Sequence, residues 1–326
     1  MKEYIRKLAV FVTIGVLGLL VNAPNVKSST PSPTIDPVVS TDWLSAHSAE
    51  VVILDIRNAV DYGAGHIPGS INEPFITGFD PCTGPSSNWI IGRSDCVWLE
   101  LPKKEDLFKT IGNLGITKYS LVVIVTATNP GEPPYYGLSA ATRVADTLIY
   151  AGVKNVAILD GGYPKWVTEG KPTNTDIPNV SPITYNSRVY EEMFVSIAYV
   201  RKHIHSAAII DARDADVYFG VVIEPFAPKA GHIPNARSLP TPWMWRLNPD
   251  GTYTYKDPET LTEMAAGVIG KFTHKEIIVY CGAGAYASSW WFVLTQVLGY
   301  ENVKLYDGGS QEWVMKGYDM VPYEWQ

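Results

Sequence analysis

One cysteine stands where a sulfur nucleophile would be expected. The apolar run Ile277–Tyr280 ends at Cys281, and a helical pattern covers residues 287–298. Between them lie Gly282, Ala283, Gly284, Ala285 and Tyr286. A buried strand that passes through a glycine-containing turn into a helix gathers backbone N–H groups around its last residue, and these stabilise a thiolate or a persulfide. We therefore predict that Cys281 is the catalytic nucleophile, that residues 282–286 contact the substrate, and that no cofactor is needed. The same N–H groups predict a pKa for Cys281 below the ordinary value of about 8.5.

Two other roles suit a cysteine in this place. Cysteine often ends apolar strands as an inert core residue, but the two glycines and the helix that follow Cys281 argue against that role here. A cysteine phosphatase or arsenate reductase would use an arginine about five residues after the cysteine to clamp its oxyanion. Residues 282–289 contain no Arg or Lys. The sequence therefore argues against phosphate or arsenate chemistry at Cys281.

The chain repeats itself, and the repeat identifies the elements that must hold Cys281. The segment VVILDIR (51–57) is followed by Gly-His-Ile-Pro at 65–68, and AAIIDAR (207–213) is followed by Gly-His-Ile-Pro at 231–234. Later, residues 152–166 and 299–313 share the pattern G-x-x-N-V-x-x-x-D-G-G-x-x-x-W. Two copies of one unit, with their motifs in the same order, indicate two domains of one fold.

Short apolar runs alternate with longer helical patterns in both copies. The runs fall at 51–54, 121–125 and 156–159, and again at 208–210, 277–280 and 303–306. This alternation is typical of parallel strands joined by crossover helices. We predict an α/β fold with two domains, 34–170 and 183–326, each a mostly parallel sheet flanked by helices. The polar, Pro-rich stretch 171–182 is the expected linker.

Taken together, the motifs resemble the tandem rhodanese family of sulfurtransferases. The shared features are D-x-R, G-H-I-P, an apolar strand ending in Cys with a short Gly-rich loop, and D-G-G-x-x-x-W, and they cover nearly all of the chain after residue 30. The resemblance implies two rhodanese-like domains, of which the carboxy-terminal one is catalytic through Cys281. In the first copy the matching strand, Leu121–Val125, runs into Thr126 and a longer Pro-rich loop without cysteine. This domain is therefore expected to be catalytically silent and to close over the site of the second.

The same resemblance implies transfer of a sulfane sulfur by double displacement. A small anionic donor, thiosulfate, would load a persulfide on Cys281, and the sulfur would pass to cyanide or a thiol acceptor. The loop CGAGAY also shares two glycines with enzymes that use 3-mercaptopyruvate, although Ala283 and Tyr286 replace the hydroxyl residues of those enzymes. That donor is one alternative. A non-catalytic binding module with the same fold is another, but it would have no use for a thiol at position 281.

An anionic donor needs a cation beside Cys281. The resemblance assigns this role to Arg213 of the D-x-R motif, which could instead be a structural ion pair with Asp211. Lys229 is a second candidate, because it lies in a segment, 219–230, that the first copy lacks and that would line the rim of the site. Other residues of interest are Arg237 and Arg246 as further cations, His66 and His232 as turn residues, Asp160 and Asp307 as turn or helix-cap residues, and Trp243 and Trp245 at the domain interface.

Cys82 and Cys96 lie in one long loop after the first Gly-His-Ile-Pro. A loop of this length without regular structure needs an explanation, and an oxidising compartment would allow a disulfide between the two. The pairing would leave Cys281 as the one free thiol of the three cysteines. Their spacing does not suit a structural zinc site, so no metal is expected. Two unpaired thiols in a cytoplasmic protein are the alternative.

The amino-terminal residues carry a targeting pattern. Lys2, Arg6 and Lys7 precede the apolar run 8–21, which is shorter than a helix that spans a bilayer. We expect residues 1–28 to be a signal peptide for export to the periplasm or another extracytoplasmic space, with no stable membrane insertion after cleavage. An uncleaved anchor is the alternative. The net charge of −7 without a basic cluster argues against nucleic acid as a partner.

Overall fold

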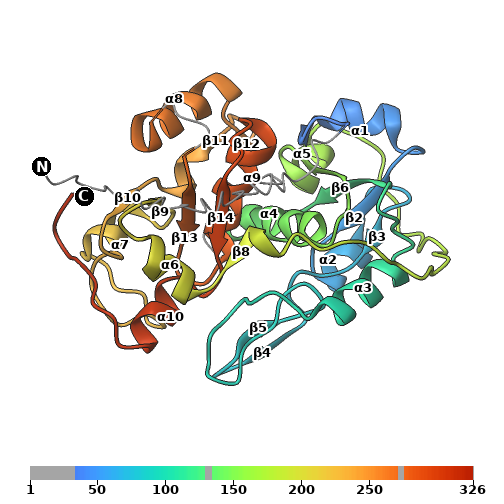
Figure 1. Cartoon of the computed structure of the whole chain (residues 1–326). Helices are drawn as coiled ribbons and strands as arrows, with labels where there is room; N and C mark the ends of the chain where they lie inside the picture. Colours follow the sequence, from blue (N-terminus) through green and yellow to red (C-terminus); the bar gives the residue numbers. More distant parts are fainter. Residues whose placement is uncertain (1–33, 129–133, 271–274, 326) are drawn as a thin grey trace, which may run out of the picture.

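The computed structural model describes residues 34–128, 134–270 and 275–325 (Figure 1). The predicted signal peptide, residues 1–28, lies outside the described residues, as does part of the loop that follows Thr126. Within the described ranges, no helix combines the length and the apolar character needed to cross a membrane.

The first domain is a parallel sheet covered by helices. Its five strands lie in the order β1-β7-β6-β2-β3, and all neighbours are parallel. The strands are β1 (Val38–Val39), β2 (Val52–Asp55), β3 (Ile71–Asn72), β6 (Leu121–Val125) and β7 (Asn155–Leu159). The helices are α1 (Thr41–His47), α2 (Ala59–Ala64), α3 (Lys104–Asn113), α4 (Pro134–Tyr150) and α5 (Gly162–Thr168). A two-stranded antiparallel hairpin, β4 (Gly78–Asp80) and β5 (Gly84–Ser86), stands apart from this sheet.

The second domain repeats the arrangement. Its strands lie in the order β10-β9-β13-β14-β8, again all parallel. They are β8 (Phe194–Val195), β9 (Ala208–Asp211), β10 (Ala236–Ser238), β13 (Ile277–Tyr280) and β14 (Val303–Tyr306). The helices are α6 (Ile197–His203), α7 (Ala215–Phe219), α8 (Pro258–Ile269), α9 (Ala285–Phe292) and α10 (Gly309–Met315), and an antiparallel hairpin joins β11 (Trp245–Leu247) to β12 (Tyr253–Tyr255). The predicted α/β fold with two mostly parallel sheets is confirmed.

Short apolar strands form here because both faces of each sheet are covered. All four residues of β13 and all five of β7 are buried, which requires apolar side chains on both faces and explains the unbroken apolar runs in the sequence. Three predicted strands, 121–125, 277–280 and 303–306, have the bounds that the structure gives them. The strand predicted at 156–159 begins one residue earlier, the one at 208–210 ends one residue later, and the one at 51–54 is shifted by one residue at both ends.

The helix after Cys281 begins earlier than predicted. It starts at Ala285 rather than residue 287, so Ala285 and Tyr286 are its first residues and not part of the loop. The reason is Gly284, whose φ of 86° reverses the chain in one residue and allows the helix to begin at once. The helix continues after Phe292 as a π-helical turn, Val293–Val297.

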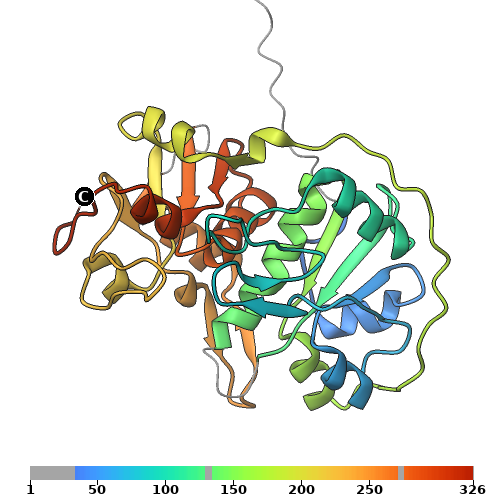
Figure 2. The same ribbon diagram turned by 90° about the horizontal axis from the view of Figure 1, so that it is seen from below.

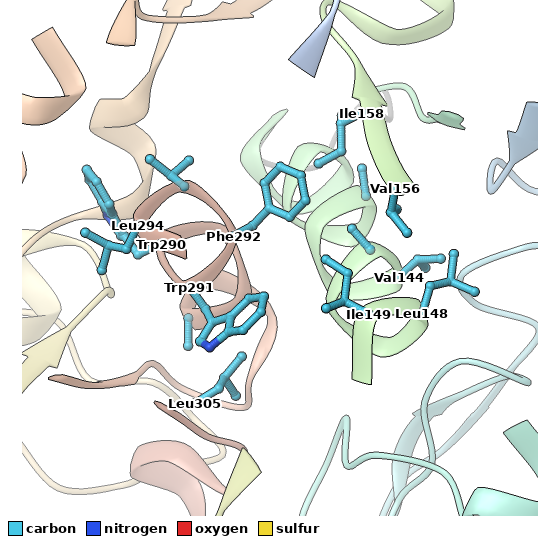
Figure 3. Packing of buried hydrophobic residues seen from close by; sticks show 14 of the residues in the cluster. Val144, Leu148, Ile149, Val156, Ile158, Trp290, Trp291, Phe292, Leu294 and Leu305 are labelled. Atoms are coloured by element: carbon cyan, nitrogen blue, oxygen red, sulfur yellow. The ribbon is translucent and has the colours of Figure 1, made fainter. Parts of the chain in front are cut away.

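The two domains share one hydrophobic core. Helices α4 and α9 pack against each other between the two sheets (Figures 1 and 3), with Val144 and Leu148 of α4 in the same buried cluster as Trp291 and Phe292 of α9. Hydroxyl groups also join the helices: Thr142 Oγ1 lies 2.9 Å from both Ser288 Oγ and Ser289 Oγ. Because this core is continuous, the two domains are held in one arrangement relative to each other.

The irregular connection between the domains includes the predicted linker, 171–182, and continues to residue 190 along the outside of the first domain. Residues 175–190 are irregular and pass around that domain in Figure 2. Within it, the backbone N–H of Ile183 donates to Gly112 O at 2.9 Å, and the Tyr185 hydroxyl donates to Ala151 O at 2.8 Å. Gly112 has no space for a side chain, since a Cβ there would lie 2.4 Å from Ile183 O.

Both D-G-G aspartates lie in turns, as expected, and each also forms a contact between the domains. Asp160 Oδ1 accepts a hydrogen bond from the Tyr255 N–H of the second domain at 2.9 Å. In mirror fashion, Asp307 Oδ2 accepts from the Leu101 N–H of the first domain at 2.8 Å. Asp307 also forms a bidentate ion pair with the fully buried Arg143 of α4.

The two Gly-His-Ile-Pro histidines are structural, as predicted. His66 is fully buried and contacts Tyr62 O at 2.9 Å and Asp176 O at 3.0 Å through its two ring nitrogens. His232 is equally buried; its Nδ1 lies 3.0 Å from Tyr218 O, and its ring stacks on that of Tyr218 at 3.8 Å between centroids. Both rings stabilise the turn after the D-x-R strand.

Candidate active site

A cavity of about 340 Å³ lies between the two domains, at the carboxyl ends of their strands. Equivalent positions of the two copies face it: Arg57 and Asn58 from the first domain, Arg213 and Asp214 from the second. Cys281 lines the cavity together with Gly282, Ala283, Ala285 and Tyr286. The structure thus brings together the thiol, most of the predicted loop and one predicted cation. Open α/β sheets bind ligands at this edge.

Cys281 is the free cysteine of the described residues, and its side chain is almost fully buried, with 3% exposed. Burial raises the pKa of the Cys281 thiol to about 11, against hydrogen bonds from the backbone of Ala287, Ala283 and Gly284 that lower the pKa. The nearby Glu224 carboxylate raises the pKa further. The predicted low pKa is therefore wrong for this arrangement, because removal of water costs the thiolate more than the cradle of N–H groups returns.

The loop after Cys281 has little space at its two glycines, and at Gly284 the backbone conformation itself favours glycine. At Gly282 a Cβ would lie 2.7 Å from Glu224 Oε1 and 2.9 Å from the ring of Phe226. At Gly284, which has φ +86°, a Cβ would lie 2.8 Å from Asp307 Oδ1. Gly284 itself lies outside the residues that line the cavity, so its role is to turn the backbone N–H groups toward the sulfur.

Arg213 borders the cavity, but it also forms the structural ion pair with Asp211 that the sequence analysis gave as its alternative role. Its Nη2 donates to Asp211 Oδ2 at 2.6 Å and to Gly231 O at 2.7 Å. Its Nη1 lies 3.2 Å from Glu224 Oε2 and 3.4 Å from Ser310 Oγ. With 2% of its surface exposed, Arg213 presents only Nη1 to a ligand, and Glu224 already occupies that nitrogen.

Lys229 does not reach the cavity, which corrects the expectation for it. Its Nζ donates to Tyr318 O at 2.9 Å and lies 3.4 Å from Asp319 Oδ1, both in the carboxy-terminal segment. The segment 219–230 does border the site, as expected, but it does so through Glu224 and Phe226. The segment therefore contributes a carboxylate and an aromatic ring where an ammonium group was predicted.

The other residues considered from sequence lie elsewhere. Arg237 donates to Val268 O at 2.9 Å and Arg246 to Thr254 Oγ1 at 3.2 Å, and neither lines the cavity. Trp245 lies at the domain interface, as predicted, and stacks on Tyr135 of α4 at 5.8 Å between ring centroids. Trp243 is exposed instead.

Thr126 occupies in the first domain the place that Cys281 has in the second. The Tyr163 N–H donates to Thr126 O at 2.8 Å, as the Ser310 N–H donates to Cys281 O at 2.8 Å. Thr126 also lines the cavity. The first domain therefore has a hydroxyl group at the strand end where the second has a thiol, and a threonine hydroxyl is a poor sulfur carrier.

Comparison with known proteins decides the family. The chain matches the rhodanese-like domain over residues 40–169 and 196–316. It belongs to the rhodanese-like domain family. Relatives include the sulfur carrier protein TtuD of Thermus thermophilus, 31% identical over 85% of this chain and 93% of the relative. Another is a putative thiosulfate sulfurtransferase of Saccharopolyspora erythraea, 30% identical over 85% of this chain and 92% of the relative.

Solved structures agree on the rhodanese fold. A structure of EanB in complex with ergothioneine superposes with a TM-score of 0.72, at 22% identity, over 89% of this chain and 71% of EanB. The wild-type structure of EanB gives a TM-score of 0.71 at 22% identity, over 88% and 69% of the two chains. At this identity the likeness concerns the fold.

An arm of the first rhodanese domain, residues 78–100, completes the wall of the cavity. The Cys82–Cys96 disulfide joins its two sides, and Pro85, Trp98 and Leu99 line the cavity from it. The arm also binds α10 of the second domain: Trp98 N donates to Gln311 Oε1 at 2.8 Å, and Gln311 Nε2 donates to Cys96 O at 3.1 Å. In Figure 2 it reaches from the first domain to the centre of the molecule.

Sequence reasoning missed several residues of this rhodanese site. They are Arg57 and four other residues that line the cavity, Trp98, Tyr136, Glu224 and Phe226. Arg57 repeats the D-x-R pairing through Asp55, with Nη2 to Oδ2 at 2.6 Å, and its guanidinium stacks on the Tyr163 ring at 3.6 Å. The repeat could have identified Arg57, because it is the equivalent of Arg213 in the first copy. If the two copies face each other, the two arginines must lie on opposite sides of the site.

Proposed function

We propose that this rhodanese is a thiosulfate sulfurtransferase that carries sulfur as a persulfide on Cys281. One observation carries the proposal: a free thiol, surrounded by backbone N–H groups of its own loop, borders a cavity between the two domains. The names of relatives that are putative thiosulfate sulfurtransferases support the choice of donor.

The reaction has two displacement steps. The Cys281 thiolate attacks the outer sulfur of thiosulfate, the sulfur–sulfur bond of the donor breaks, and sulfite leaves with its electron pair. A cyanide or thiolate acceptor then attacks the outer sulfur of the persulfide, and Cys281 leaves as a thiolate with the bonding pair. The N–H groups of Ala283, Gly284 and Ala287 stabilise the anionic sulfur in both steps.

The donor must approach Arg213 in competition with Glu224. Arg213 Nη1 is the cationic group of the second domain that borders the cavity, and Glu224 Oε2 lies 3.2 Å from it. A thiosulfate dianion bound there has to replace the carboxylate or find it protonated. Burial raises the pKa of Glu224, partly offset by Arg213, which makes the protonated form easier to reach.

3-Mercaptopyruvate is the second candidate donor. The observation that favours it is the uncharged loop: Gly282, Ala283, Gly284 and Ala285 provide no basic side chain beside the thiol. Both donors would give the same Cys281 persulfide, so the two proposals differ only in the first step.

The test compares the two donors on the same protein. Purified protein is incubated with thiosulfate or with 3-mercaptopyruvate, the added sulfur is located by mass spectrometry, and thiocyanate release is measured with cyanide as acceptor. We expect one sulfur at Cys281, faster turnover with thiosulfate, and neither uptake nor release in Cys281→Ser. Faster turnover with 3-mercaptopyruvate would overturn the choice of donor. Absence of sulfur uptake from both would overturn the catalytic proposal and favour a binding module.

We also propose that the protein is exported. The Cys82–Cys96 disulfide supports this, because structural disulfides persist mainly in oxidising compartments. Cell fractionation, with amino-terminal sequencing of the mature protein, tests it. Recovery of the chain in the cytoplasm with its first residue intact would contradict the proposal.

A further inference from the structure

Thiosulfate uses only a small part of the cavity. A cavity of about 340 Å³ is of the size that holds drug-like ligands, whereas thiosulfate has five non-hydrogen atoms. Because Cys281 is almost fully buried, an acceptor must also enter by a route that reaches the sulfur. The part of the cavity beyond the donor is therefore available to the second substrate.

Two pairs of aromatic rings line this remaining space. Trp98 of the arm packs on Phe226 with 5.2 Å between ring centroids, and Tyr136 of α4 packs on Tyr286 with 5.6 Å. All four residues line the cavity. Each pair combines one ring from the first domain with one from the second, so both pairs exist only when the domains are assembled. Rings of this kind provide a flat apolar surface at low entropic cost.

The charged groups of the cavity disfavour a second anion. The charged residues among the described lining are Arg57, Arg213, Asp214 and Glu224. Arg57 is paired with Asp55, and Arg213 with both Asp211 and Glu224. With Asp55 and Asp211 counted, four carboxylates face two guanidinium groups. Once the donor has left, Glu224 can pair with Arg213 again and the persulfide adds a negative charge of its own, so a carboxylate on the acceptor meets more repulsion than the donor did.

Trp98 is held in place before any ligand arrives. Its Nε1 donates to Cys82 O at 2.6 Å, and its backbone N–H donates to Gln311 Oε1 at 2.8 Å. The disulfide fixes Cys82 relative to Cys96. A residue held by hydrogen bonds from both its side chain and its backbone loses little conformational freedom when a ligand packs against it.

We propose that the aromatic pairs Trp98–Phe226 and Tyr136–Tyr286 form the acceptor site, and that the acceptor is a small thiol whose apolar or aromatic body carries no negative charge. This inference rests on the proposed sulfur transfer through Cys281. The acceptor thiolate attacks the outer sulfur of the persulfide, a new sulfur–sulfur bond forms, and the bond to Cys281 Sγ breaks with its electron pair on Sγ. The rings place the acceptor body while its thiol faces that outer sulfur.

The experiment measures the discharge step alone. Cys281 is loaded with sulfur, the donor is removed by gel filtration, and loss of the persulfide is followed by mass spectrometry after addition of a thiol. Ethanethiol is compared with 2-phenylethanethiol, which adds a ring at similar thiol acidity. Phenylmethanethiol is compared with 4-(mercaptomethyl)benzoate, which adds a carboxylate. We expect the ring to accelerate discharge by at least about tenfold and the carboxylate to slow it by a similar factor.

Variants assign the selectivity to the rings. In Phe226→Ala we expect the preference for 2-phenylethanethiol over ethanethiol to fall toward one, and in Trp243→Ala, where the ring is exposed and does not line the cavity, we expect it to be retained. Using the ratio of two acceptors within one variant removes any difference in loading.

The outcomes separate this inference from the proposed function. Failure of thiosulfate to load Cys281 contradicts the donor proposal, and the protein can then be loaded with inorganic polysulfide so that discharge is still measured. A persulfide that discharges at equal rates to all four thiols overturns the acceptor site. Faster discharge to the carboxylate than to phenylmethanethiol overturns its charge preference.

Discussion

At the scale of single residues, the site is governed by what burial does to charge. Cys281 and Glu224 are neighbours in one cavity, and burial raises the pKa of both. Burial shifts both groups toward the protonated form, and the Glu224 carboxylate raises the pKa of the thiol further. The pH dependence of the enzyme should therefore contain two opposing contributions that single substitutions can separate.

The reactivity of Cys281 should increase with pH well beyond the range of an ordinary thiol. Burial raises the pKa of Cys281 to about 11, and only the thiolate is nucleophilic. Below this pKa the rate of alkylation by an uncharged reagent such as iodoacetamide should rise by about tenfold per pH unit. Peptide mapping of the donor-free protein follows Cys281 labelling, with Cys281→Ser as the blank. An alkylation rate that stops rising at or below the pKa of a free thiol, about 8.5, would contradict this prediction.

Glu224→Gln should improve the use of thiosulfate. The amide removes a negative charge 3.2 Å from Arg213 Nη1, so the donor gains the guanidinium without competition, and kcat/KM for thiosulfate should rise by roughly tenfold, mainly through KM. The advantage over the wild type should shrink as pH falls, because the wild-type carboxylate, with its raised pKa, then takes up a proton and loses the same charge.

The control for this effect is Glu259→Gln, since Glu259 is exposed in the first turn of α8 and lies outside the cavity. It should leave the kinetics at their wild-type values. A lower kcat/KM in Glu224→Gln at neutral pH would mean that the carboxylate assists catalysis instead of competing with the donor.

At the scale of elements, the arm of residues 78–100 connects the two domains. It belongs to the first domain by sequence, but it binds α10 of the second domain and supplies part of the cavity wall. Arg93 Nη1 lies 2.7 Å from Glu312 Oε1, and Lys316 Nζ lies 3.1 Å from Asp95 Oδ2. Arg93 and Asp95 both lie in the loop that the Cys82–Cys96 disulfide closes, so the disulfide restrains the segment that makes these contacts.

The disulfide should be measurable as a stability contribution. Closing a loop of this length is worth about 3 kcal/mol in the chain-entropy model, so the double variant Cys82→Ser/Cys96→Ser should lose about that much free energy of unfolding, measured by urea denaturation without reductant. Thiol titration of the denatured, unreduced protein provides the matching chemical test. We expect one titratable thiol, from Cys281, and a count of three would show that the two cysteines are not paired.

At the scale of the whole molecule, we expect the two domains to unfold as one cooperative unit. A single hydrophobic cluster includes residues of α4, α9 and both sheets, and each D-G-G aspartate accepts a backbone hydrogen bond from the other domain. The cavity exists only between the assembled domains. Unfolding of one domain is therefore expected to remove the active site and to expose much of the core of the other.

The two aspartates should differ sharply in what they contribute. Asp307→Asn leaves the fully buried Arg143 without its ion-pair partner, and breaking a buried pair costs about 3–5 kcal/mol. Asp160→Asn should cost little, because an amide oxygen still accepts from Tyr255 N–H. In addition, burial raises the pKa of Asp160 to about 6, so its charge is unfavourable to the folded state above that pH, and the amide removes this penalty at neutral pH.

Urea unfolding followed by tryptophan fluorescence and by far-ultraviolet circular dichroism measures both variants. One coincident transition is expected for each protein, with a lower midpoint in Asp307→Asn than in Asp160→Asn. Equal midpoints, or two separate transitions in the wild type, would argue against a shared core held by the Arg143–Asp307 pair.

The sequence by itself determined the features that depend on local pattern. Strands buried on both faces leave unbroken apolar runs, so β6, β13 and β14 were predicted with the bounds that the structure gives them. The repeat predicted two copies of one α/β unit, and the position of Cys281 at the end of β13 followed from the strand and the glycines after it. The ion pair of Arg213 with Asp211 was also one of the two roles predicted for Arg213, because the two residues are separated by only one position in the D-x-R motif.

Tertiary structure alone decided which charged groups and which side chains line the cavity. Trp98, Tyr136 and Glu224 reach the cavity from three separate segments, and no local pattern shows which side chains of a loop point inward. For the same reason Lys229 was wrongly predicted to reach the site, while Glu224, five residues earlier in that segment, does reach it. The prediction of a low pKa for Cys281 was wrong. The local sequence indicates the backbone N–H groups, whereas the loss of water depends on what the rest of the chain packs over the sulfur.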